Sequence, residues 1–162
     1  MSKVQNNEVF VTTKEAFQAV GLKWEGTFAE AGAGEIRLVH ADMQKRLGEI
    51  PYVLNKETLL GLSYHATPNG DGFTHYAVVE VEKTASIPSG MMNIEIPTLT
   101  YATTQHYREQ SIEQSYSNVY SWISQNGYKE NKNVPLTHFE KYPMNQDPHS
   151  DSPEFLIMIP IK

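Results

Sequence analysis

The chain has 162 residues, of which 40% are hydrophobic and 20% are charged, and its formal net charge is −6. This composition is typical of a globular protein, and the length favours one domain that buries about two-thirds of its unfolded surface. The acidic balance argues against direct binding to nucleic acid, which requires a basic patch. The absence of cysteine excludes disulfides and thiol chemistry.

Targeting signals are not evident in the sequence. The N-terminal segment lacks the apolar core of a signal peptide, and no run of about 18 apolar residues occurs. We therefore expect a cytoplasmic protein that does not enter a membrane. Residues 1–8 are polar and are expected to be flexible.

The hydrophobic pattern of the first half predicts a strand, a helix and a hairpin. In chain order, the expected elements are strands at 9–11 and 17–24, a helix at 35–47, and strands at 59–65 and 73–82. The helix is amphipathic, because one face of its 3.6-residue period carries Ile36, Val39, Met43 and Leu47. Between the last two strands, Asn69-Gly70 and Asp71-Gly72 tolerate the positive φ of a hairpin turn.

The second half repeats the same order of elements. We expect a strand from 94 to 107 that passes through Pro97, a helix from 111, and strands at 136–142 and 155–161. Ser111 and Gln114 have the spacing of a capping box, and Gly127 lies where a left-handed residue ends the helix. The last strand is apolar on both faces, which predicts a central position in a sheet.

The two halves, 9–84 and 91–162, thus follow one βαββ pattern within a single domain spanning 1–162. Two such repeats commonly join into one antiparallel sheet with both helices on one face. The sequence therefore predicts an α+β fold with pseudo-twofold symmetry.

Four short segments of the second half occur in a distinctive order and spacing. They are IPTLTYA from Ile96, a helix with Trp122 before Gly127-Tyr128, FEKY from Phe139, and IPI from Ile159. Together they resemble the GyrI-like domain, the effector-binding domain of AraC-type and MerR-type transcription activators. The resemblance implies a bacterial multidrug-binding module with a SOUL-like fold. It also implies a ligand cleft on the concave side of the sheet, opposite the helices.

Glu140 is the leading candidate for a binding residue. It lies between Phe139 and Tyr142, where a carboxylate can neutralise a cation while aromatic rings supply cation–π contacts. The resemblance assigns it this role, because the glutamate of F-E-x-Y meets cationic drugs in GyrI-like drug sensors. The competing interpretation is a solvated glutamate paired with Lys141 or Lys129.

Aromatic residues complete the candidate ligand-binding site, although several are expected to belong to the core. The full set is Glu140, Tyr142, Tyr101, Tyr64, Phe139, Trp122, Tyr76 and Trp24. Among the histidines, His65 and His75 could face each other across the hairpin, His138 shares a strand face with Glu140, and His40 is interpreted as an interior residue. None has the spacing of a metal site, so a metal centre built from these residues is the weaker alternative, and the prediction is no metal and no cofactor.

Three functions are compatible with these residues. The favoured one is a stand-alone small-molecule binding protein for a lipophilic cationic or aromatic ligand, acting alone or through a regulatory protein. The second is a hydrolase of strained, cyclopropane-containing genotoxins, with Glu140 as catalytic candidate and an aromatic residue or Glu80 assisting. The third is a protein–protein inhibitor of the DNA gyrase inhibitor type, whose acidic surface competes with DNA.

Overall fold

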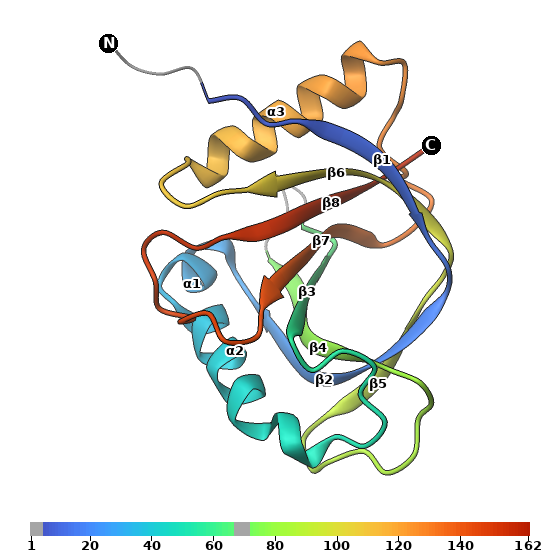
Figure 1. Cartoon of the computed structure of the whole chain (residues 1–162), viewed down its shortest axis with the longest axis vertical. Helices are drawn as coiled ribbons and strands as arrows, with labels where there is room; N and C mark the ends of the chain where they lie inside the picture. Colours follow the sequence, from blue (N-terminus) through green and yellow to red (C-terminus); the bar gives the residue numbers. More distant parts are fainter. Residues whose placement is uncertain (1–4, 67–71) are drawn as a thin grey trace.

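A computed structural model describes residues 5–66 and 72–162 and places all its strands in one antiparallel sheet (Figure 1). The strands are β1 (Val9–Lys14), β2 (Phe17–Gly26), β3 (Thr58–Tyr64), β4 (Phe73–Val81), β5 (Met92–Ile96), β6 (Leu99–His106), β7 (Leu136–Pro143) and β8 (Phe155–Ile161). The helices are α1 (Phe28–Gly32), α2 (Glu35–Arg46) and α3 (Ile112–Gln125), with a 3₁₀ turn η1 (Leu47–Glu49) after α2. The hairpin turn predicted around Asn69-Gly70 lies outside the described residues.

The strand order β1-β6-β8-β7-β3-β4-β2-β5 has the expected pseudo-twofold symmetry. The first repeat contributes β2, β4 and β3, and the second contributes β6, β8 and β7 in the matching positions. Antiparallel pairing of β3 with β7 joins the two repeats at the centre. The position of β8 between β6 and β7 confirms that the last strand is central.

The strand predicted to run through Pro97 is wrong, because the chain there forms two separate strands. β5 ends at Ile96 and pairs with β2, whereas β6 begins at Leu99 and pairs with β1 and β8. Proline lacks the N–H that a continuous ladder needs, so the break falls at this residue.

The sheet is strongly curved, since strands from its two ends are joined by very short connections (Figure 1). Lys14 in β1 and Phe17 in β2 are three residues apart, a span of at most about 11 Å. Lys14 also forms a 2.6 Å ion pair with Glu80 of β4. Side chains from both ends of the strand order therefore meet on one face, which is the concave face.

Three apolar clusters divide between the two faces. The concave face carries Ala19, Leu60, Leu62, Val78, Ile96, Leu99, Tyr101, Leu136, Phe139 and Met158. On the other face, α2 covers Val20, Leu59, Ala77, Val79 and Val81, and α3 covers Ala102, Phe155, Ile157, Ile159 and Ile161. Tyr142 packs against both of these helix-covered clusters. Both longer helices therefore lie on the convex face, as predicted.

The start of α3 combines a predicted cap with one that the sequence did not indicate. The hydroxyl of Ser111 accepts the Gln114 amide at 3.1 Å, and Gly127 has a φ of +80° after the helix, as expected. The Gln114 side chain, however, donates to Asn118. Its place in the capping box is taken by Gln5, whose Oε1 accepts the Ser111 amide at 2.8 Å.

The short helix α1 was not predicted from the sequence. Thr27 and Glu30 form a complete capping box at its start, with bonds of 3.1 Å and 2.8 Å. Its five residues are too few for an apolar period to be visible. Among the helices of the described residues, none combines the length and apolar character that crossing a bilayer requires.

The backbone of β2 approaches that of β4 closely at Gly21. A Cβ atom at this position would lie 2.1 Å from the Ala77 carbonyl oxygen and 2.7 Å from the Val78 Cα, both backbone atoms. We expect Gly21→Ala to lower the free energy of unfolding by about 1–3 kcal/mol or more, because the paired strand must shift. Equilibrium unfolding in urea measures this loss. Gly48→Ala is the control, since nothing lies within 4 Å of the added atom, and equal stability of the two variants would contradict the packing described.

Candidate functional site

A cavity of about 370 Å³ opens on the helix-covered face, where the two repeats meet. Residues of α1 and α2 form one wall, the start of α3 forms the other, and β3, β4 and β7 form the base. We expected Glu140 to lie in a cleft opposite the helices, but it lies in this one. Alternation along β7 places Phe139 on the concave face and Glu140 on the helix-covered face.

Glu140 is held between two tyrosine hydroxyl groups. Tyr142 donates to Oε1 at 2.6 Å, and Tyr116 of α3 donates to Oε2. Burial raises the pKa of the Glu140 carboxyl, and the two hydrogen bonds oppose part of this rise. Burial, with the nearby carboxylate charge, also raises the pKa of both tyrosines well above 10.0.

In the described part of the chain, no cationic side chain forms an ion pair with Glu140. The ion pairs there join Lys14 to Glu80, Lys23 to Glu25 and Arg46 to Glu49. Lys141 points to the concave face, where its ammonium lies 5.9 Å from the Phe139 ring centre. The carboxyl is therefore satisfied by hydroxyl donors rather than by a cation.

A buried chain of hydrogen bonds runs beside Tyr142. His40 Nε2 lies 3.0 Å from His75 Nε2, and His75 Nδ1 lies 3.0 Å from Ser63 Oγ. The His40 ring meets the Tyr142 ring edge-on at 5.0 Å. Burial lowers the pKa of His40 to about 4 and that of His75 well below 6.5, so both imidazoles are neutral at neutral pH.

The expected pairing of His65 with His75 across the hairpin is wrong. His75 is aligned with Ser63 in the β3–β4 register, whereas His65 follows the end of β3 with a φ of +57°. The prediction failed because the described strand β3 ends at Tyr64, one residue before His65.

His138 shares a face with Glu140, as predicted. Its Nε2 lies 2.7 Å from the Tyr120 hydroxyl, and its ring lies 4.8 Å from that of Tyr116. Burial lowers the pKa of His138 to about 4. Although several histidines and Glu140 surround the cleft, no three potential metal ligands are grouped closely enough within residues 5–66 and 72–162 to hold an ion.

The mouth of the cleft is apolar on both sides. Phe28 of α1 stacks on Phe73 with ring centres 4.8 Å apart, and Phe73 meets Trp24 edge-on at 5.2 Å. Across the cleft stands Ile112 at the start of α3. Phe28 and Ile112 are 45% and 42% exposed, so an apolar group entering the cleft would cover both.

The loop between β7 and β8 forms the remaining wall. Its Gln146 carbonyl accepts the Gln44 side-chain amide at 2.7 Å, and its His149 carbonyl accepts Arg37 at 3.4 Å. Both donors belong to α2, so a loop of the second repeat is fastened to a helix of the first.

The predicted aromatic residues divide between the two faces of the sheet. Tyr142 lines the cleft, and Trp24 lies behind its apolar wall. Four others lie on or against the concave-face cluster, namely Tyr101, Phe139, Tyr64 and Tyr76. Trp122 stacks on Tyr128 at 5.6 Å beside α3. These five do not line the cleft around Glu140.

Sequence reasoning missed several residues that do line the cleft. Tyr116 was not among the candidate residues, and His40 was interpreted only as an interior residue. Phe28 lies in the unpredicted helix α1. For Tyr116 a signal was available, because a hydroxyl on an apolar helix face needs a partner when it is buried.

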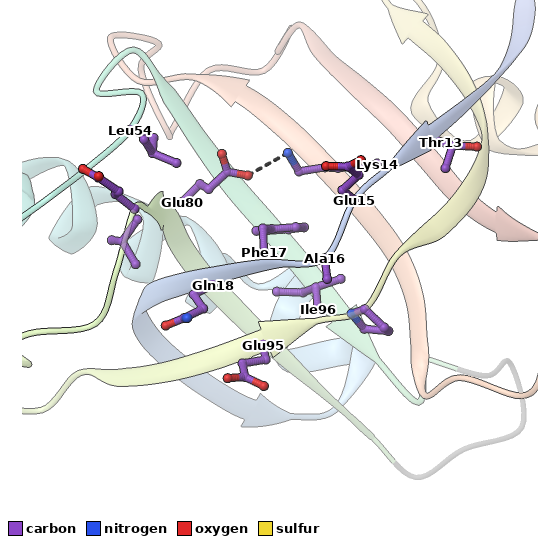
Figure 2. A pocket seen from close by; sticks show the side chains of 13 residues that line it. Thr13, Lys14, Glu15, Ala16, Phe17, Gln18, Leu54, Glu80, Glu95 and Ile96 are labelled. Atoms are coloured by element: carbon purple, nitrogen blue, oxygen red, sulfur yellow. Dashed lines mark ion pairs between the residues drawn. The ribbon is translucent and has the colours of Figure 1, made fainter.

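A larger hollow of about 860 Å³ lies on the concave side, around the junctions of β1 with β2 and of β5 with β6 (Figure 2). There the Lys14 ammonium pairs with Glu80 and lies 4.6 Å from the Phe17 ring centre. These two charges neutralise each other. The position of Glu80 also corrects the expectation that it could assist Glu140, since the two lie on opposite faces.

Comparison with solved structures identifies similar folds. The C-terminal domain of EcmrR superimposes with a TM-score of 0.72 at 14% identity, covering 98% of this chain and 99% of that domain. SAV2435 bound to tetraphenylphosphonium gives 0.69 at 18% identity, with coverage of 96% and 94%. EcmrR in its DNA complex gives 0.70 at 15% identity, and the match covers 96% of this chain but only 57% of the EcmrR chain.

Sequence comparison agrees with the fold. No curated protein sequence matches the chain. A family model described as the GyrI-like small molecule binding domain matches residues 7–162, which is nearly the whole chain. The chain therefore belongs to the GyrI-like family.

Proposed function

We propose that the protein binds an amphipathic organic cation in the cleft, with Glu140 as the counter-charge. The observation that carries this proposal is the carboxyl held by Tyr116 and Tyr142, with no cationic partner among residues 5–66 and 72–162. A carboxylate removed from water is unfavourable unless a positive charge compensates it. A bound cation would supply that charge, while the surrounding rings offer cation–π contacts.

The surroundings of Glu140 support a ligand with a large apolar portion. Phe28, Phe73 and Ile112 line the cleft, and its volume is within the range of small-molecule pockets, about 300–1,000 Å³. The tetraphenylphosphonium bound to SAV2435 is a cation of this type. In this protein the consequence of binding would be sequestration of the ligand or a signal to a regulatory protein.

The same carboxyl favours a second candidate function, hydrolysis of a strained electrophile. A carboxyl group with a raised pKa, placed between two phenols, suits proton transfer to or from water. Incubation with a cyclopropane-containing electrophile, followed by mass spectrometry, separates the two functions. A product heavier by one water that forms only when Glu140 is present favours hydrolysis, and unchanged compound with saturable binding favours a binding protein.

The charge of Glu140 determines cation affinity under this proposal. Glu140→Gln keeps the size of the side chain and deletes its charge, so we expect tetraphenylphosphonium binding to weaken by about 2–5 kcal/mol. Isothermal titration calorimetry measures this loss. Glu80→Gln is the matched control, because that carboxylate lies on the concave face, and its affinity should equal that of the wild type. Equal affinities of all three proteins would remove Glu140 from the site.

The raised pKa of Glu140 predicts that Glu140→Gln changes stability in the opposite direction from cation affinity. Between the ordinary value of 4.5 and its raised value, the folded protein holds this proton more tightly than the unfolded chain does. The contribution of Glu140 to the free energy of unfolding therefore falls as pH rises through this window. Glu140→Gln has no such proton. The melting temperature of this variant minus that of the wild type should therefore increase as pH rises above 4.5. The cleft histidines titrate in both proteins, so their contributions to this difference largely cancel. A difference in melting temperature that does not change with pH would contradict the raised pKa of Glu140.

Direct binding to nucleic acid is not expected from a chain with a net charge of −6. A protein that neutralises few phosphates gains little from counterion release, so duplex DNA should stay unbound at physiological salt. A mobility-shift assay with micromolar protein tests this, and a salt-sensitive shift would contradict the expectation.

A further inference from the structure

His40 carries a ring nitrogen that is not used by the fold. Its Nε2 is bonded to His75, and no hydrogen-bond partner of Nδ1 occurs among residues 5–66 and 72–162. The side chain is only 7% exposed, yet it lines the cleft. Among these residues, only the Tyr101 hydroxyl and Thr103 Oγ1 are side-chain atoms that are fully buried and lack a hydrogen-bond partner. His40 Nδ1 also lacks a partner, but it is not one of these fully buried atoms. His40 Nδ1 is therefore open to the cleft.

The hydrogen-bond chain behind His40 can reverse its direction. If Ser63 donates to His75 Nδ1, then His75 donates through Nε2 to His40, and His40 keeps its proton on Nδ1. If His75 instead donates to Ser63, His40 donates through Nε2 and its Nδ1 is a free acceptor. Both arrangements satisfy every internal bond of the chain, so the nitrogen facing the cleft can donate or accept.

His40 and Glu140 both contact Tyr142 and both line the cleft. The Tyr142 hydroxyl donates to Glu140, while the Tyr142 ring meets the His40 ring at 5.0 Å. A molecule large enough to fill the cleft can therefore contact both groups. Since burial keeps the His40 imidazole neutral at neutral pH, it does not repel a cation held by Glu140.

We propose that His40 Nδ1 is a second recognition point that hydrogen-bonds a polar group carried by the bound cation. The inference rests on the proposed function and narrows it. The ligand class becomes amphipathic cations that carry a hydroxyl, carbonyl or amide group beside their apolar portion. Cations built only of hydrocarbon would use Glu140 and the aromatic wall alone.

Matched phosphonium cations test this assignment. The probes are tetraphenylphosphonium and its analogues with one hydroxyl at the meta or para position of a single phenyl ring. For the wild type we expect one hydroxylated analogue to bind about 3- to 10-fold more tightly than the parent, the gain of one net hydrogen bond. His40→Phe keeps an aromatic ring but removes both nitrogens. It should lose the preference for the hydroxylated analogue, and the ratio of the two affinities is the readout.

The outcomes separate this inference from the proposed function. A wild type without preference, or a preference that persists in His40→Phe, overturns the role of His40 while leaving cation binding intact. Failure of the wild type to bind any of the probes overturns the proposed function itself. A general structural defect in His40→Phe would weaken all probes equally and leave the preference in place, contrary to the proposal.

A measurement on the wild type makes the test independent of whether the variant folds. The ¹⁵N chemical shift of His40 Nδ1 should move when the preferred hydroxylated cation is added at saturation, and much less with the parent cation. Equal shifts with both cations would contradict a hydrogen bond to the ligand.

Discussion

The pairing of β3 with β7 is the constraint on which the site depends. It joins the two repeats and aligns Glu140 with Gly61. A Cβ atom at Gly61 would lie 3.1 Å from His75 Cε1 and 3.3 Å from Tyr142 Cε2. The missing side chain therefore lets these two rings approach the base of the cleft. Without this pairing, the carboxyl of one repeat and the buried histidines of the other would not share a cavity.

The polar base of the cleft is arranged so that neutral groups surround one acid. Burying a carboxylate costs free energy, and two hydroxyl donors recover only part of it. Charged imidazoles at His40, His75 or His138 would offset the acid, but burial keeps all three neutral at neutral pH. The fold therefore leaves the charge of Glu140 without an internal counter-charge in the described residues, which is a costly arrangement for stability and a favourable one for binding a cation.

Much of the fold follows from local sequence patterns, whereas the site depends on how the patterns combine. The apolar periods located α2 and α3, and the βαββ repeat indicated the symmetric sheet. Residue type also identified Glu140 and Tyr142. Alternation puts Phe139 and Glu140 on opposite faces of β7, but the sequence did not reveal which face holds the cleft, so aromatic residues of both faces were assigned to it. Tyr116 and His40 were missed because their partners are distant in the chain.

The wall of the cleft formed by α3 is fixed from outside the cavity. Ser115, the neighbour of Tyr116, accepts Gln5 at 2.7 Å and Asn7 at 3.2 Å, so its own proton goes to His106 Nδ1 at 2.7 Å. Tyr116 meanwhile reaches Glu140. Successive residues of one helical turn thus bind the N-terminal segment and the candidate site. Residues 5–8 were expected to be flexible because they are polar, yet two of their amide side chains order the turn that carries Tyr116 of the cleft. Any movement of Tyr116 on ligand binding must therefore be accommodated by these hydrogen bonds or must break them.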